Sequence, residues 1–147
     1  MTQIETQSLR IERTYDAPLA RVRAALTEPK LLAKWFAPAP MTAHVHACDA
    51  RVGGQYEISM VGKDPEGNDA THTATGTFTE VGPRRVAMTF NWSEQPLPNE
   101  TTLAFDLEET KAGTRLVLTH GGFPNQEAAT LHTEGWEGCL AKLPQAL

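Results

Sequence analysis

Cysteine, long apolar runs and positive charge are all scarce in this sequence, and each shortage excludes a class of protein. The 147 residues include two cysteines, Cys48 and Cys139, with no CxxC or Cys/His zinc spacing. A disulfide framework and a structural zinc site are therefore not predicted. No apolar run approaches the roughly 18 residues of a membrane span, and residues 1–10 have neither the basic nor the apolar region of a secretory signal. We expect a soluble, cytoplasmic protein.

Acidic residues outnumber basic ones, 18 against 13, and the formal net charge is -5. Beyond the pair Arg84 and Arg85 there is no basic cluster, so nucleic acid is not an expected partner. The sequence also lacks a GxSxG elbow, a P-loop and a GxGxxG fingerprint, which removes the hydrolases and nucleotide-binding proteins that those motifs define. With 40% apolar residues, the chain is long enough for one core, and we expect residues 1–147 to form a single domain.

The first part of the chain alternates in the manner of a strand and then changes to helical spacing. Apolar and polar residues take turns over residues 8–15, as in a half-buried strand. Pro18 and Pro29 each suit the first turn of a helix, where a missing N–H costs nothing. Two short helices are therefore predicted after the first strand, and the prolines within residues 37–40 end the second one.

The remainder of the chain predicts a sheet covered by one helix. From about residue 43 to 120, apolar residues recur at every second position between turn sequences, which indicates roughly six antiparallel strands. Asn125 can then cap a last helix whose apolar face carries His132, Trp136 and Cys139. A sheet with one face to bury and a helix with an apolar stripe form a two-layer α+β domain.

Several phrases of the sequence, in their order and spacing, are similar to those of a known family. Residues from about 8 to 143 resemble the activator of Hsp90 ATPase homologue 1-like proteins, which belong to the START/polyketide cyclase/Bet v 1-like (SRPBCC) superfamily. The matching phrases are RTYDAP at 13–18, LLAKWF at 31–36 and DARVGG at 49–54, then Gly76 with Glu80-Val81, and finally Gly135-Trp136 followed by Leu140 and Leu143.

The resemblance implies a helix-grip fold. In that fold a curved antiparallel sheet of about six or seven strands wraps around a long C-terminal helix, with two short helices after the first strand and a cavity between sheet and helix. Most members are seen as binders of small apolar or amphipathic molecules, and a minority catalyse cyclisation or dehydration in the cavity. The family takes its name from a co-chaperone domain.

Alternation along the strands also predicts which polar side chains face this cavity. If the even positions of the strand around residue 46 face inward, three of them form a row along one edge of the pocket. Two other strands contribute His72 and His120 and the last helix contributes His132, so that all five histidines lie on the cavity side or at its rim. The residues concerned are His44, His46, Cys48, His72, His120 and His132.

A metal or cofactor is not expected at this row. Neighbouring same-face positions on a strand are about 6.5–7 Å apart. This spacing is too long for His44, His46 and Cys48 to bind one metal ion together. Cys48 and Cys139 lack any motif that lowers a thiol pKa, so each is expected to act as a small buried apolar residue.

The first functional hypothesis is a binding protein, monomeric or homodimeric, that encloses a small apolar or aromatic molecule between the sheet and the last helix. Trp35 and Phe36 are expected at the cavity mouth as a mobile lid, because they stand beside a proline-rich loop. The residues predicted to contact the ligand are Trp35, Phe36, His46, Cys48, Tyr56, Ile58, Met88, Phe90, Phe105, His120, His132, Trp136 and Cys139.

Two alternatives stay open at this point. One is an enzyme of the cyclase or dehydratase type, in which His46 and His132 exchange protons and Tyr56 orients a carbonyl. The other is a chaperone-linked or stress-linked interaction protein, which would bind its partner through an exposed face instead of the cavity.

Overall fold

The computed structural model describes residues 7–64 and 66–147. Residues 1–6, part of the stretch that shows no secretory signal, and Pro65, in a predicted turn, lie outside the described residues. The strands of the described chain are β1 (Gln7–Tyr15), β2 (Thr42–Cys48), β3 (Gln55–Lys63), β4 (Asp69–Val81), β5 (Arg85–Trp92), β6 (Thr101–Thr110) and β7 (Gly113–Phe123). The helices are α1 (Leu19–Thr27), α2 (Pro29–Trp35) and α3 (Gln126–Lys142), with a 3₁₀ turn at Leu143–Ala146.

Over the described residues the strands form one antiparallel sheet in the order β1-β7-β6-β5-β4-β3-β2. The first strand pairs with the last, with Leu9 opposite His120 and Tyr15 opposite Thr114. The strands from β2 to β7 are joined as successive neighbours, so each pair is local in sequence and only β1 makes a long-range pairing. The predicted curved antiparallel sheet with a C-terminal helix is confirmed.

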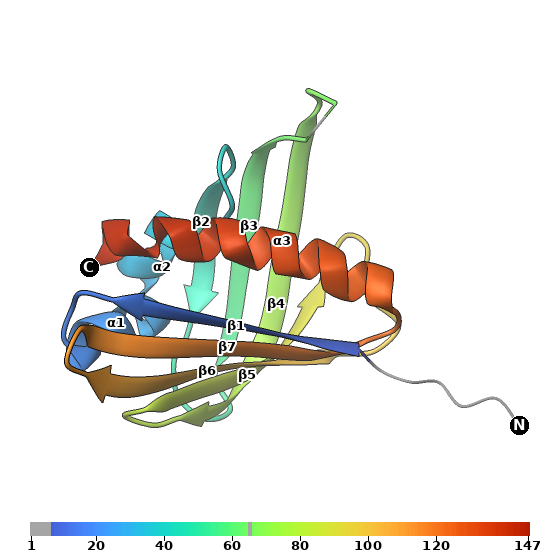
Figure 1. Cartoon of the computed structure of the whole chain (residues 1–147). Helices are drawn as coiled ribbons and strands as arrows, with labels where there is room; N and C mark the ends of the chain where they lie inside the picture. Colours follow the sequence, from blue (N-terminus) through green and yellow to red (C-terminus); the bar gives the residue numbers. More distant parts are fainter. Residues whose placement is uncertain (1–6, 65) are drawn as a thin grey trace, which may run out of the picture.

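Helix α3 lies against one face of the sheet, running along β1 and β7 and crossing β2, β3 and β4, as Figure 1 shows. The Asn125 side chain accepts a hydrogen bond from the Ala128 N–H and so caps its first turn, as predicted. Near its other end, the Tyr15 hydroxyl of β1 donates to the Leu140 carbonyl at 2.9 Å. None of the helices described has the length and apolar character needed to cross a membrane.

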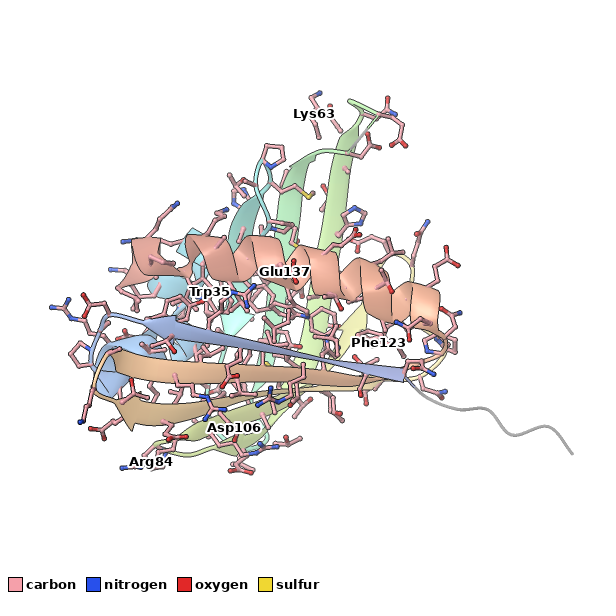
Figure 2. All side chains as sticks on the ribbon, in the orientation of Figure 1. Trp35, Lys63, Arg84, Asp106, Phe123 and Glu137 are labelled. Carbon is pink, nitrogen blue, oxygen red and sulfur yellow. The ribbon has the colours of Figure 1, made fainter. Side chains whose placement is uncertain are left out.

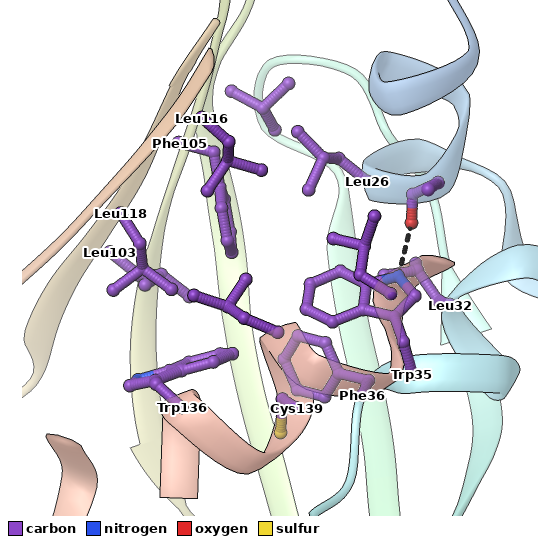
Figure 3. Close-up of a cluster of buried hydrophobic side chains, with 14 of the residues drawn as sticks. Leu26, Leu32, Trp35, Phe36, Leu103, Phe105, Leu116, Leu118, Trp136 and Cys139 are labelled. Carbon is purple, nitrogen blue, oxygen red and sulfur yellow. Dashed lines mark hydrogen bonds between the residues drawn. The ribbon is translucent and has the colours of Figure 1, made fainter. Parts of the chain in front are cut away.

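The interior between the layers is filled with side chains from α2 and α3. Trp35 and Phe36 are 0% and 2% exposed. The Trp35 Nε1–H donates to the Ala25 carbonyl of α1 at 2.8 Å, and the ring meets Phe105 edge to face at 6.0 Å (Figure 3). Phe36 packs edge to face on Trp136 at 5.3 Å. The prediction of a mobile lid at these two residues is therefore wrong, because both are core residues.

A bulge in β2 changes which of its side chains face inward. Val45 pairs with Ile58, but Ala47 pairs with the next residue of β3, so His46 is an extra residue in the strand. Ala43 and Val45 turn toward the core before the bulge, and His44 is exposed. The predicted inward row is wrong for His44 and His46, because period-two alternation does not continue through a bulge, whereas Cys48 packs against the core as predicted.

Gly76 in β4 lets the strand pass close to its neighbours. A Cβ atom added there would lie 1.9 Å from the Thr89 carbonyl oxygen and 2.8 Å from Cε1 of Tyr56. The same carbonyl accepts a hydrogen bond from the Tyr56 hydroxyl at 2.6 Å. Gly76 thus creates the space in which Tyr56 crosses β4 and ties β3 to β5.

Gly76→Ala is expected to lower the free energy of unfolding by about 1–3 kcal/mol, because the new methyl group must displace backbone. Gly135→Ala is the matched control. In α3 a Cβ at position 135 would meet no atom within 4 Å, so this variant should gain roughly 0.5–1 kcal/mol of helix propensity. Urea unfolding of both variants measures the difference, and equal stabilities would contradict the packing described for Gly76.

Candidate functional site

A pocket of about 370 Å³ lies between α3 and the sheet at β3, β4 and β5, and it is open to solvent on one side. Strand residues form its floor, α3 forms one wall, and loops before β2 and after β5 complete its rim. The lining residues are Pro38, Met60, His72, Phe90, Trp92, Glu94, Gln95, Leu131, His132, Gly135, Trp136 and Cys139. Aromatic and aliphatic groups dominate this lining.

The residues predicted to contact a ligand fall into three places in the structure. Phe90, His132, Trp136 and Cys139 line the pocket. Six others surround a residual void of about 10 Å³ in the core, scarcely enough for one water molecule; they are Trp35, Phe36, Tyr56, Ile58, Met88 and Phe105. The last three lie elsewhere: His120 is buried behind the pocket wall, and His46 and Cys48 are on β2.

Trp136 and His120 form a buried hydrogen-bonded pair behind the pocket. The Trp136 Nε1–H donates to Nδ1 of His120 at 3.0 Å. The His120 Nε2 must therefore carry the proton of the neutral ring, and it lies 2.7 Å from the Thr101 hydroxyl, which in turn donates to the Phe90 carbonyl at 2.7 Å. Burial, with a smaller contribution from the nearby His132, lowers the pKa of His120 to about 3.

Trp92 and His132 repeat this arrangement at the pocket wall itself. The Trp92 Nε1–H donates to Nε2 of His132 at 3.0 Å. The His132 Nδ1 is 2.7 Å from the Ala128 carbonyl, so the ring proton is on Nδ1. Burial lowers the pKa of His132, and the hydrogen bond to Ala128 opposes that shift. Both nitrogens of each imidazole are therefore engaged.

The two pairs join one aromatic cluster that holds α3 on the sheet. The His120 and His132 ring centroids are 5.7 Å apart, Phe123 lies 4.5 Å from each of them, and Phe90 lies 4.8 Å from His120. The cluster takes its members from β5, β7 and α3. Its packing fixes the orientation of Trp92 and Trp136, and with them the shape of the pocket wall.

The polar groups of the pocket are at its mouth. The Glu94 carboxylate accepts a hydrogen bond from the Thr73 N–H at 2.7 Å, and hydrogen bonding from Thr73 lowers its pKa. The His72 ring lies 6.1 Å from Trp92. Leu131 of α3 stands 60% exposed at the same opening. The pocket thus combines an apolar interior with a rim that includes one carboxylate.

The loop that carries Pro38 is held in place by the last turn of α3. The Lys142 ammonium donates to the Ala37 carbonyl at 2.9 Å and the Met41 carbonyl at 3.2 Å. Pro38 packs so closely on Gly138 that a Cβ atom there would lie 2.7 Å from the Pro38 Cβ. These contacts give the pocket a fixed rim on the side nearest α2.

The three residues predicted for acid–base catalysis are not brought together. The His46 Nε2 pairs with the Ser59 hydroxyl at 2.9 Å on the face of the sheet opposite Ile58. The Tyr56 hydroxyl is bound to the Thr89 carbonyl, and burial raises its pKa. His132 alone lines the pocket. Within residues 7–64 and 66–147, no group of three His, Cys, Asp or Glu side chains could hold a metal ion.

The two thiols are in apolar surroundings. The Cys48 Sγ lies 3.6 Å from the Thr27 carbonyl, and burial raises its pKa. Burial also raises the pKa of Cys139, which faces the pocket, to about 12. A thiol in this state is neutral and unreactive.

Some lining residues were missed at the sequence level although a signal was present. Met60 and Trp92 continue the period-two alternation of Ile58 and of Phe90, and Leu131 stands four positions before Gly135 on the same helix face. Glu94 and Gln95 had no such signal, because they lie in the loop after β5, where no periodicity applies.

Comparison with known proteins relates the whole fold to one family. The model of the Activator of Hsp90 ATPase homolog 1-like protein family matches residues 16–147. A comparison with curated proteins finds no match.

Several solved structures share the architecture over nearly the full length. Protein CV1439 of Chromobacterium violaceum is 27% identical, with a TM-score of 0.84, and the match covers 94% of each chain. Protein NE0264 of Nitrosomonas europaea is 30% identical, with a TM-score of 0.73, over 95% of this chain and 92% of its own. The AHSA1 protein SPO3351 of Silicibacter pomeroyi is 27% identical, with a TM-score of 0.79, over 95% and 96%.

The buried histidines predict how stability depends on pH. Folding keeps His120 neutral, with its pKa at about 3 instead of the ordinary 6.5, so below about pH 6.5 the unfolded chain binds the extra proton. The contribution of the neutral His120 ring to the free energy of unfolding is therefore complete above pH 6.5. It is lost as the pH falls toward 3, by up to about 1.4 kcal/mol per pH unit. NMR titration of the His120 ring nitrogens measures the pKa of His120 in the folded protein directly.

Trp136→Phe is the informative variant, because it removes the N–H that stabilises the neutral His120 ring and keeps an aromatic side chain. We expect the His120 pKa to rise in this variant. Trp35→Phe is the matched control, since Trp35 donates to Ala25 and not to a histidine. A His120 ring that titrates between pH 6 and 7 in the unmodified protein would contradict the hydrogen-bonded pair.

Proposed function

The chain belongs to the Activator of Hsp90 ATPase homolog 1-like family, and we propose that it is a cytoplasmic binding protein that holds a small apolar or aromatic molecule between α3 and the strands β3, β4 and β5. The fold of this family generally binds ligands. The specific pocket and the class of molecule are the proposal.

The observation that carries the proposal is the combination of volume and lining. A space of about 370 Å³ is within the roughly 300–1,000 Å³ of small-molecule sites, which are mostly apolar with a few polar groups. Phe90, Trp92 and Trp136 offer aromatic faces, and Met60 and Leu131 add aliphatic surface. A ligand that covers apolar surface otherwise exposed to water binds favourably, because that surface is removed from water.

The proposed ligand occupies the open end of the helix–sheet interface. Trp35, Phe36 and Phe105 fill the centre of the domain, where the cavity was expected from the resemblance. Gly135 provides the extra room, because a side chain at this position would extend from α3 into unoccupied space. The ligand is therefore expected to contact α3 along Leu131, Gly135 and Cys139.

Neither alternative function gains support from a particular contact. For the enzyme, a general acid or base needs a titratable nitrogen that can reach a substrate, and both nitrogens of His132 are engaged by Trp92 and Ala128. For a chaperone-linked or stress-linked interaction protein, Val52 and Leu131 are the large exposed apolar residues of the described chain, and they lie on separate elements.

Gly135→Leu is expected to block ligand uptake, because its side chain would occupy the pocket. The neutral dye N-phenyl-1-naphthylamine, whose fluorescence increases in apolar sites, serves as the probe. We expect its dissociation constant to rise at least about tenfold, which corresponds to about 1.4 kcal/mol of lost binding.

Thr130→Leu is the matched control, since it adds the same side chain at an exposed position of α3 away from the pocket. This variant should bind the dye as the unmodified protein does. The proposal fails if the unmodified protein does not bind the dye, or if both variants lose it to the same extent while circular dichroism shows an intact fold.

A further inference from the structure

The charge around the pocket is of one sign. Glu94 is the one Asp, Glu, Lys or Arg among the residues found to line it. Its hydrogen-bond partner is the Thr73 backbone N–H, and the nearby His72 ring also favours its charged form. Hydrogen bonding from Thr73 also lowers the pKa of Glu94, which is ionised at neutral pH.

The helix over the pocket adds to the same field. Helix α3 carries the exposed acidic residues Glu127, Glu134 and Glu137, and Figure 2 shows Glu137 on its outer side. Its one basic residue, Lys142, is at the far end and is held by the Ala37 and Met41 carbonyls. Fixed charge of one sign around a low-dielectric opening raises the local concentration of ions of the opposite sign.

The indole and imidazole donors of the pocket interior are already used inside the protein, which leaves the His72 ring and the Gln95 amide as side-chain donors among the lining residues. The indole N–H groups of Trp92 and Trp136 point to His132 and His120. The ring proton of His132 is bound to the Ala128 carbonyl. A carboxylate or sulfonate in this pocket would lose its hydration without gaining these donors, and an uncompensated buried charge is costly.

What the pocket does present is aromatic faces beside a carboxylate. Phe90, Trp92 and Trp136 line the interior, and Glu94 is at the mouth. The faces of such rings are electrostatically negative and attract cations. An ammonium group near the mouth would therefore interact favourably with both Glu94 and the ring of Trp92.

We propose that the pocket selects a cationic amphiphile, an aryl or alkyl ammonium compound whose apolar part lies against Trp92 and Trp136 and whose charge is at Glu94. This inference rests on the proposed function, because it names the chemical class of the ligand for the same pocket. It also predicts an order of affinities. An ammonium compound binds more tightly than its neutral analogue, and the neutral analogue binds more tightly than the carboxylate.

Three probes of one shape test the order of affinities at pH 8: 1-naphthylmethylamine, 1-naphthylmethanol and 1-naphthoate. NMR titration that follows the indole N–H signals of Trp92 and Trp136 gives a dissociation constant for each. We expect the amine to bind about tenfold tighter than the alcohol, the combined effect of one exposed ion pair and one cation–π contact. The carboxylate should bind weakest.

Glu94→Gln should weaken amine binding about three- to fivefold and leave alcohol binding unchanged, because the amide removes the charge and keeps an acceptor for the Thr73 N–H. Glu100→Gln is the matched control, because it removes the same charge from the same loop at a residue that does not line the pocket. Amine binding should be unchanged in this variant.

An amine that binds no better than the alcohol, or that is insensitive to Glu94→Gln, overturns the inference while the binding function stands. Failure of all three probes to bind overturns both.

Discussion

Three buried or half-buried indole N–H groups, each with one internal acceptor, hold the layers of this domain together. Trp35 of α2 donates to α1, Trp92 of β5 donates to α3, and Trp136 of α3 donates to β7. A large side chain with a polar atom can be buried at little cost only where its donor finds a partner. Trp35 thus fixes α2 on α1, Trp92 and Trp136 fix α3 on the sheet, and the location of the pocket follows from these positions.

The same requirement explains why the domain is solid in its centre and open at one end. Trp35 and Phe36 enter the interior from α2 and meet Trp136 and Phe105, which leaves little space between the layers. Toward the start of α3 the residue before Trp136 is Gly135, which has no side chain to fill the space between the helix and β3, β4 and β5. An empty space therefore remains where no large side chain from α2 can reach.

The sequence predicts most of the fold and part of the pocket, and the errors have identifiable physical causes. Alternation and capping are local signals, so the strands and the Asn125 cap of α3 are readable from neighbouring residues. The bulge at His46 adds one residue without changing composition, so that Cys48 after it faces the core as expected, whereas His44 before it faces the other side. Burial of Trp35 depends on Ala25 and Phe105, which meet it only in the folded chain. Phe90 and Trp136 follow the regular spacing of a strand and a helix, which predicts their position at the helix–sheet interface. Glu94 lies in a loop, where no regular spacing predicts the position of a side chain.

The pairing of β1 with β7 separates the order of synthesis from the order of assembly. Strands β2 to β7 can pair one after another as they leave the ribosome, but β1 is made first and finds its partner last. Until β7 has emerged, the apolar residues Leu9 and Ile11 have no surface to cover them, and the Tyr15 hydroxyl lacks its acceptor on α3. Contacts between distant parts of a chain slow folding and prolong the exposure of apolar segments. The nascent chain is therefore most vulnerable to aggregation through its oldest strand, until the last elements are released.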